Sequence, residues 1–184
     1  GEMYANHGER TALMMPKHYV QVVFDGLASL IESTPNIKHD SLLHVSFYGG
    51  EPLLNFSLIE YIVGYINSHP IQGRSVRYSF TTNGILLHKY IDFLVEHNFE
   101  ILISLDGNRQ GNRYRLDYSG TSHFDQIVSN IEQIRLKYPN FYKDNISFNA
   151  VIHDKNSVIE TAKFINEQFG KIPHMGELNP VGVA

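Results

Sequence analysis

The sequence predicts an α/β fold built around a parallel sheet. Segments with helical patterning alternate with short β-rich segments along the 184 residues. The helical segments are long enough to act as right-handed crossovers, which return each strand parallel to the previous one. The chain is too short for a (β/α)₈ barrel, which needs about 250 residues. We therefore expect one domain, residues 1–184, with about five strands in an open sheet or a partial barrel.

The expected helices are recognised by apolar residues three or four positions apart, which would line one face of a helix. In residues 16–32 they are Tyr19, Val22, Val23, Leu27, Leu30 and Ile31. Pro16 suits the first position of that helix. Similar spacing predicts helices over residues 56–67, 88–97, 124–137 and 157–169.

The expected strands are short runs rich in β-branched and aromatic residues. They cover residues 42–48, 75–81, 100–105, 145–152 and 174–181. Glycine pairs and Asn-Gly or Asp-Gly turns follow the first three. Residues 108–122 form the longest connection. Because the carboxyl ends of parallel strands share one edge of the sheet, we expect ligands to bind at the loops on that edge.

Composition excludes several classes of function. The formal net charge is −4, which argues against a general nucleic-acid-binding surface. The chain has no cysteine, so it cannot itself form a disulfide or ligate an iron–sulfur cluster through thiolates. Its ten histidines include no pair at metal-binding spacing, so no metal site is expected. No signal peptide or membrane-spanning segment is evident, and a cytoplasmic location is expected.

The strand ends carry the candidate site residues. Gly49 and Gly50 allow a sharp turn and a close approach of ligand to backbone, and Glu51 can accept hydrogen bonds from an ammonium group. Thr82 and Asn83 suit recognition of a ribose or a peptide. For these residues the alternative is an ordinary strand-end turn.

Three further residues lie at or beyond the end of the third strand. Ser104 can bind a hydroxyl or carboxylate, and Arg115 can hold a carboxylate through its planar fork. For Arg115 the alternative is a solvated charged loop. Asp106 could be catalytic, but an Asp-Gly turn is the favoured interpretation.

Together these segments resemble the radical S-adenosylmethionine (SAM) superfamily, in particular the branch of anaerobic sulfatase-maturating enzymes and related peptide maturases. The matching segments are Phe47-Tyr48-Gly49-Gly50-Glu51-Pro52-Leu53-Leu54, Thr82-Asn83-Gly84-Ile85-Leu86-Leu87, Ile103-Ser104-Leu105-Asp106-Gly107, Asn112-Arg113-Tyr114-Arg115 and Gly120-Thr121-Ser122-His123-Phe124. Each motif is weak alone, but five in register are hard to produce by chance.

The resemblance implies a partial (β/α)₆ barrel, here truncated to about five strands. It implies that Gly49, Gly50 and Glu51 hold the methionyl ammonium of SAM, while Ser104 and Arg115 hold its ribose and carboxylate. Arg115 requires a one-residue gap in the alignment, so Arg113 is the fallback. The cavity would also be lined by Thr82 and Asn83, with Val151 and Ile152 against the adenine.

The implied parent protein is a radical SAM oxidoreductase that modifies a protein or peptide side chain, for example a sulfatase cysteine or serine converted to formylglycine. Such enzymes use a [4Fe–4S] cluster held by a Cys-x₃-Cys-x₂-Cys loop, which this chain lacks. We therefore expect a catalytically incompetent core fragment that binds SAM very weakly or not at all. An exposed sheet edge would favour self-association.

Two alternatives remain. The chain could be a non-catalytic module with a radical-SAM-like fold that binds a peptide or a partner protein. It could also be an unrelated lyase using Asp106 and a lysine, although no lysine is evident at a strand end.

Overall fold

The computed structural model describes residues 15–34, 42–71, 74–117 and 119–177. The chain divides into two compact units. One contains helices α1 (Lys17–Ser33) and α2 (Phe56–Ser68). The other contains the five described strands and helices α3 to α6. Because the chain divides into two units, the expectation of a single domain stays a prediction.

The first unit is a helix pair held by contacts repeated along both helices. Gln21 Nε2 donates to the Tyr61 hydroxyl at 3.2 Å, and the Tyr65 hydroxyl donates to Asp25 Oδ1 at 2.7 Å. The Phe24 ring lies 6.4 Å from that of Tyr65. Positions 21 and 25, like 61 and 65, are one helical turn apart, so the two helices contact each other through matching faces.

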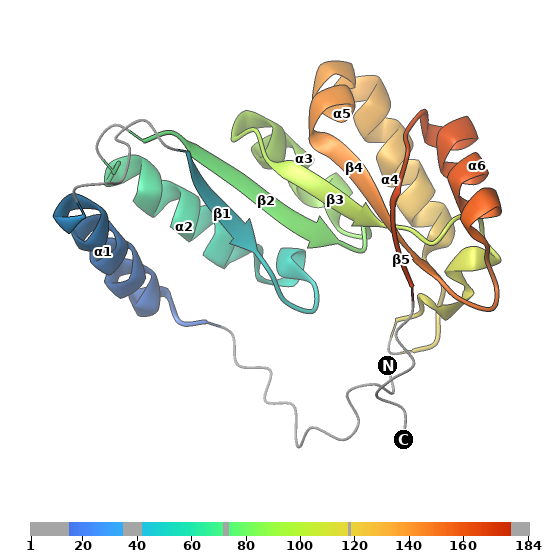
Figure 1. Cartoon of the computed structure of the whole chain (residues 1–184), viewed down its shortest axis with the longest axis horizontal. Coiled ribbons are helices and arrows are strands. Elements are labelled where there is room, and N and C mark those ends of the chain that lie inside the picture. Colours follow the sequence, from blue (N-terminus) through green and yellow to red (C-terminus); the bar gives the residue numbers. More distant parts are fainter. Residues whose placement is uncertain (1–14, 35–41, 72–73, 118, 178–184) are drawn as a thin grey trace. The chain divides into compact units, whose positions relative to one another are not determined.

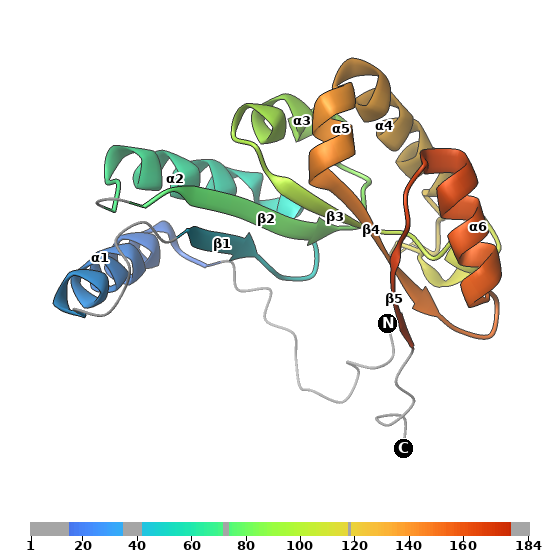
Figure 2. The same cartoon turned by 45° about the horizontal axis from the view of Figure 1, so that its top comes forward.

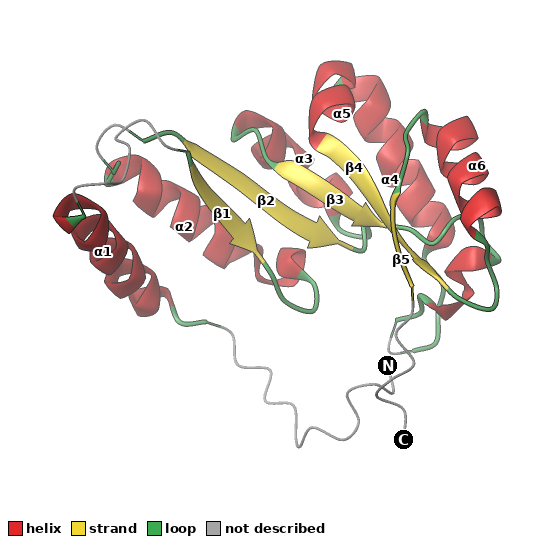
Figure 3. Cartoon of the chain, viewed as in Figure 1, coloured by secondary structure: helices red, strands yellow, loops and turns green. Residues whose placement is uncertain are grey.

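The second unit is built on a parallel five-stranded sheet, as predicted, with strand order β1-β2-β3-β4-β5 (Figure 3). The strands are β1 (Leu43–Phe47), β2 (Val76–Thr82), β3 (Glu100–Ser104), β4 (Ile146–Ile152) and β5 (His174–Glu177). Among the described strands β1 pairs with β2 alone, so one of its edges carries no described strand partner. Self-association through that edge stays a prediction.

Helices α3 (Leu87–Glu96), α4 (Phe124–Lys137) and α6 (Val158–Phe169) lie along one face of this sheet (Figures 1 and 2). The strand residues that form the core of this unit are Phe80, Ile101, Ile103, Phe148 and Ala150, all at most 2% exposed. The alternate positions are more exposed and mostly polar, for example Ser79, Ser104, Ser147 and Asn149, although Leu102 and Val151 are apolar. Because side chains alternate along a strand, the sheet has one buried, apolar face and one partly exposed, mainly polar face.

The structure adds short elements that the sequence did not predict. They are the 3₁₀ helices η2 (Pro52–Asn55) and η3 (Gly111–Tyr114), and helix α5 (Pro139–Asn145). Helix α5 is seven residues long, too short to show a repeated apolar pattern. The last strand ends at Glu177, and residues 178–181 lie outside the described residues. No helix in the described ranges has the length and apolar character needed to cross a membrane.

Tyr142 of α5 should make stability fall at high pH. Its hydroxyl donates to the Phe169 carbonyl at 2.7 Å, and burial raises its pKa to about 12. An unfolded tyrosine ionises near pH ~10. Between these values the unfolded chain binds fewer protons than the folded chain, so the free energy of unfolding should decrease with rising pH, by up to about 1.4 kcal/mol per pH unit.

Urea denaturation from pH ~9 to ~12 measures this slope. Tyr142→Phe should flatten it, although not fully, because burial also raises the pKa of Tyr78. Tyr19→Phe, at an exposed position of α1, is the control and should leave the slope unchanged. An identical slope in wild type and Tyr142→Phe would contradict the assignment.

Candidate functional site

Glu51 joins the loop after β1 to the end of β2. Its Oε1 accepts hydrogen bonds from the Leu53 amide at 3.2 Å and from Thr82 Oγ1 at 2.9 Å. Its Oε2 accepts from the Asn83 amide at 2.8 Å. A carboxylate has about four acceptor positions, so these bonds leave about one, on Oε2, for a ligand. Glu51 therefore connects the loop after β1 with the end of β2, and these bonds hold its carboxylate in a defined position.

Gly49 and Gly50 present open backbone beside Glu51. Both are exposed, and a Cβ added at either would meet no atom within 4 Å. Neither has a positive φ. The described chain therefore leaves room for a ligand to contact the main chain at both glycines.

Thr82 and Asn83 also form the turn after β2. Thr82 Oγ1 accepts from the Gly84 amide at 3.1 Å, and Asn83 Oδ1 accepts from the Ile85 amide at 2.9 Å. Both side chains therefore make the hydrogen bonds of a turn, as the alternative interpretation expects, while Glu51 is bound by the Thr82 hydroxyl and by the Asn83 backbone amide. Their proposed contact with a ligand stays a prediction.

Asp106 forms a buried ion pair at the end of β3, and its side chain is 5% exposed. Its carboxylate accepts from Arg115 Nε at 2.6 Å and from Arg115 Nη2 at 2.7 Å. It also accepts from the Val151 amide of β4 at 2.8 Å. The favoured sequence interpretation, an ordinary Asp-Gly turn, therefore missed a connection between three segments of the chain.

Two asparagine side chains fix the backbone around Asp106. Asn112 Oδ1 accepts from the Asp106 amide at 3.0 Å, and its Nδ2 donates to the Gly107 carbonyl at 2.6 Å. Asn156 Nδ2 donates to the carbonyls of Asp106 and Val151, both at 2.9 Å. Asn112 lies within a motif that the sequence singled out, but no local pattern marked Asn156.

All nine predicted site residues lie at the carboxyl edge of the sheet. They are Gly49, Gly50, Glu51, Thr82, Asn83, Ser104, Arg115, Val151 and Ile152. Hydrogen bonds connect Glu51 with Thr82 and Asn83, and Asp106 connects Arg115 with Val151. Ser104 ends β3, paired in register with Asn149.

The two candidate arginines differ in their surroundings. The Arg115 side chain is 27% exposed beside Asp106, whereas Arg113 is exposed on η3. The arrangement favours Arg115 over Arg113 as the residue held in a defined position. Its role toward a ligand stays a prediction.

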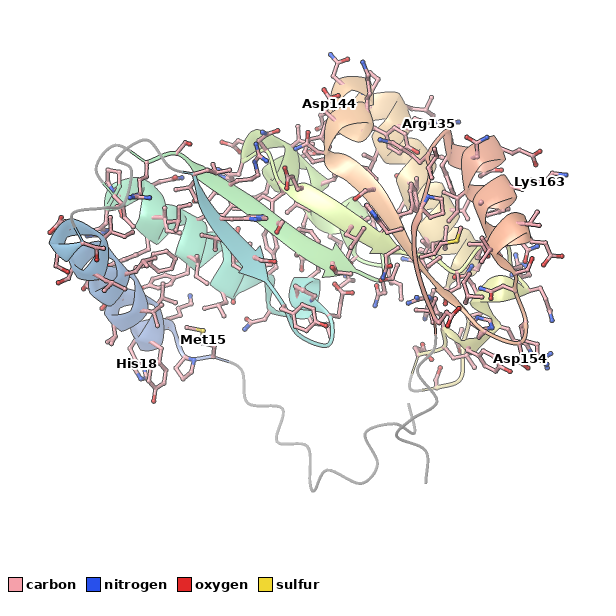
Figure 4. The ribbon with its side chains drawn as sticks, viewed as in Figure 1. Met15, His18, Arg135, Asp144, Asp154 and Lys163 are labelled. Carbon is pink, nitrogen blue, oxygen red and sulfur yellow. The ribbon has the colours of Figure 1, made fainter. Side chains whose placement is uncertain are left out.

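The loop after β4 carries a lysine, but its environment does not suit nucleophilic catalysis. Lys155 Nζ lies 2.7 Å from Asp154 Oδ2, and its hydrogen bond to Asp154 raises the pKa of Lys155. Figure 4 shows Asp154 at the end of the sheet opposite Asp144, which lies just before β4. Because a lysine nucleophile needs a lowered pKa, these contacts argue against Lys155 as the lysine of the lyase alternative.

The described residues include no group of three histidine, aspartate or glutamate side chains placed to hold a metal ion. The whole chain lacks cysteine. The residues present therefore do not fit a thiolate-held iron–sulfur cluster. The candidate site is suited instead to an organic ligand with charged and hydrogen-bonding groups.

Comparisons with known proteins identify the superfamily and the fold. The model of the Radical SAM superfamily matches residues 17–165. The radical SAM cyclopropyl synthase TigE of Paramaledivibacter caminithermalis is 26% identical over 187 residues, covering 97% of this chain and 36% of TigE. An uncharacterized protein of Methanocaldococcus jannaschii is 39% identical over 69 residues, covering 37% of this chain and 24% of that protein.

A solved structure, native anSMEcpe with bound AdoMet and Cp18Cys peptide, matches with a TM-score of 0.74 and 19% identity. The match covers 90% of this chain and 44% of that one. It confirms the predicted fold, a parallel-stranded partial barrel of the radical SAM type. This chain spans less than half the length of TigE and of anSMEcpe, 36% and 44% respectively.

Gly111 should be needed for the Asp106 cluster to form. A Cβ added at Gly111 would lie 2.2 Å from the Asp106 carbonyl oxygen, so Gly111→Ala forces η3 away from the end of β3. We expect a loss of about 1–3 kcal/mol in the free energy of unfolding, measured by urea denaturation. Gly176→Ala is the matched control, because no atom lies within 4 Å of its added Cβ, and should change stability by less than about 0.5 kcal/mol. Equal stability of the two variants would show that η3 is not packed against Asp106.

Proposed function

The chain belongs to the radical SAM superfamily, and we propose that the carboxyl edge of its sheet is the SAM cradle of an enzyme that modifies a peptide or protein side chain. The observation that carries this proposal is the presence on that edge of a positioned acceptor, Glu51, and a positioned donor, Arg115. Glu51 retains about one free acceptor position, and Arg115 has donors beyond those bound to Asp106. The methionyl part of SAM carries an ammonium, which can donate to Glu51, and a carboxylate, which can accept from Arg115.

The remaining predicted residues fit the other parts of SAM. Gly49 and Gly50 leave their backbone open to the methionyl group. Ser104 is partly exposed at the end of β3 and can bind the ribose or the carboxylate. Val151 and Ile152 end β4 and offer apolar surface for the adenine. Thr82 and Asn83 support the loop that carries Glu51.

When bound, the cofactor supplies the radical chemistry of the family, in which a hydrogen atom is abstracted from the substrate. The residues of this chain bind and orient the cofactor. Because the chain contains no cysteine, it holds no thiolate ligand for the [4Fe–4S] cluster that this chemistry requires. We therefore propose that this chain alone is catalytically incompetent, and that the activity is that of a parent oxidoreductase.

A peptide or protein is the substrate class we favour. The structure of anSMEcpe contains a bound peptide, and this chain shares its fold. The polar face of the sheet carries Ser79, Ser147 and Asn149, whose hydroxyl and amide groups can bind peptide backbone. Conversion of a sulfatase cysteine or serine to formylglycine is a specific form of this proposal. The net charge of −4 does not favour nucleic acid.

The lack of cysteine favours one alternative, a non-catalytic module that binds a peptide or a partner protein on the same scaffold. The two proposals share the fold and differ in whether SAM occupies the strand ends. Binding of SAM is therefore the property to measure.

Titration of the ¹⁵N-labelled chain with SAM tests the cradle. We expect weak binding, with a dissociation constant of about 1 mM, because the family's cluster normally contributes to holding the methionyl group. Amide signals of Gly49, Gly50, Ser104 and Val151 should shift, and that of Ile146 at the opposite end of β4 should not. Ser104→Ala should weaken binding several-fold.

Ser147→Ala is the matched control, since Ser147 lies on the same sheet face two residues before Asn149, the register partner of Ser104. It should leave the dissociation constant unchanged. An absence of shifts at the strand ends with about 10 mM SAM, or shifts confined to the amino ends of the strands, would overturn the cradle.

Anaerobic treatment of the chain with iron and sulfide tests its competence. We expect no protein-bound cluster by electron paramagnetic resonance, since no cysteine is present. With SAM and a reductant, formation of 5′-deoxyadenosine should equal that of a protein-free blank. Cluster signals accompanied by turnover would contradict the expected incompetence.

A further inference from the structure

The Asp106 carboxylate binds two parts of the candidate cradle at once. Its Oδ1 accepts from both Arg115 Nη2 at 2.7 Å and the Val151 amide at 2.8 Å. We propose that Asp106 is a positioning residue, which sets the direction of the Arg115 guanidinium and the end of β4 together for recognition of a ligand carboxylate. This inference rests on the proposed function and adds a residue to which the resemblance assigned no role.

The bonds determine which edge of Arg115 faces a ligand. Nε and Nη2 both donate to Asp106, so that edge of the guanidinium is occupied. A guanidinium is planar and has five donors, so fixing one edge also fixes the direction of the others. No hydrogen bond joins Nη1 to the described residues, and the side chain is 27% exposed. Nη1 is therefore the donor group that a carboxylate can reach.

Asp106 can orient Arg115 because its own position is fixed independently. Asn112 binds the Asp106 amide, Asn156 binds its carbonyl, and the Asp106 side chain is 5% exposed. Gly111 is packed so closely that a Cβ there would overlap the Asp106 carbonyl. The Arg115 amide donates to the Asn112 carbonyl at 3.0 Å at the end of η3, and the guanidinium reaches Asp106 at the end of a long, flexible side chain. Asp106 is thus the rigid member of the pair and Arg115 the oriented one.

The shared oxygen also couples Arg115 to β4. Val151 N–H donates to the oxygen that accepts from Nη2, so displacing the carboxylate disturbs both partners. The carboxylate cancels the formal charge of Arg115. Recognition of a second carboxylate then depends more on hydrogen-bond direction than on net attraction, which makes the orientation of the guanidinium important.

Asp106→Asn tests the proposal with a side chain of nearly the same shape. It keeps one acceptor oxygen but replaces the other oxygen and the charge, so bidentate pairing with Arg115 is lost. The retained oxygen can take the place of Oδ1 and keep the bonds from Nη2 and from the Val151 amide, whereas the new amide nitrogen then faces Arg115 Nε–H. We therefore expect a folded protein in which Arg115 Nε–H exchanges with solvent about tenfold faster or more, while exchange of the Val151 amide changes less. SAM affinity in the titration described above should fall about tenfold or more.

Asp154→Asn is the matched control. Asp154 also follows β4 and is bound by a cation and a hydroxyl, from Lys155 and Tyr114, but it contacts neither Arg115 nor Val151. It should leave hydrogen exchange at Arg115 Nε and Val151, and the SAM affinity, unchanged. If removal of any negative charge at this edge were enough to change exchange and SAM affinity, Asp106→Asn and Asp154→Asn would show equal effects. That result would contradict the specific role of Asp106.

Arg115→Lys provides a second test that leaves Asp106 intact. Lysine keeps the positive charge but lacks the planar fork, so Asp106 cannot orient a second donor edge. SAM affinity should fall to the level of Arg115→Ala. Retention of wild-type affinity by Arg115→Lys would overturn the proposal, even if Asp106→Asn fails to fold.

The outcomes separate this proposal from the cradle itself. If the wild-type chain shows no strand-end response to SAM, the proposed function fails and the ligand role of Asp106 fails with it. If Arg115→Ala abolishes SAM binding while folded Asp106→Asn retains it, Asp106 stabilises the fold but does not contribute to ligand recognition. In that case only this proposal is overturned. Loss of affinity in Asp106→Asn, Arg115→Lys and Arg115→Ala together, with normal binding in Asp154→Asn, supports it.

Discussion

The carboxyl edge of the sheet depends on carboxylates that bind the backbone of the following strand or its end. Backbone amides at this edge continue to need hydrogen-bond acceptors where the regular strand pairing stops. Glu51, after β1, accepts from the Asn83 amide just beyond β2, and Asp106, after β3, accepts from the Val151 amide in β4. Each carboxylate therefore connects two strand ends that are 32 or 45 residues apart in sequence.

The bonds of these two carboxylates explain how an edge made of loops can be ordered and still leave room for a ligand. The Asp106 side chain is almost fully buried, and Asn112 and Asn156 satisfy the backbone around it. Gly49 and Gly50, in contrast, are exposed with open space around them. A cofactor site benefits from this combination, because fixed polar groups set the ligand's orientation while open backbone admits it.

The two faces of the sheet differ in their side chains and in their burial. Helices α3, α4 and α6 lie along the face that carries Ile101, Ile103 and Phe148, where packing stabilises the unit. The other face carries serine and asparagine side chains that remain partly exposed. In the function we propose, this face and the strand ends bind the cofactor and the substrate.

The sequence by itself determined the five strands, the longer helices, the parallel sheet and the superfamily. Alternating helical and strand patterns depend on neighbouring residues, and five motifs in register depend only on order along the chain. The same patterns placed all nine candidate residues on the carboxyl edge of the sheet. Helix α5 escaped prediction because seven residues are too few to show a helical repeat.

Only the tertiary structure decided which atoms meet at that edge. Asp106 appeared to be a turn residue because its partners, Arg115 and Val151, lie 9 and 45 residues further along the chain. Asn156 carried no local signal, since its acceptors lie on a strand end 50 residues earlier and on the end of β4. Glu51 was predicted as a ligand for an ammonium group, and its bonds to Thr82 and Asn83 were not foreseen. Local patterns specify what a segment becomes, whereas long-range hydrogen bonds depend on the three-dimensional distances that folding creates.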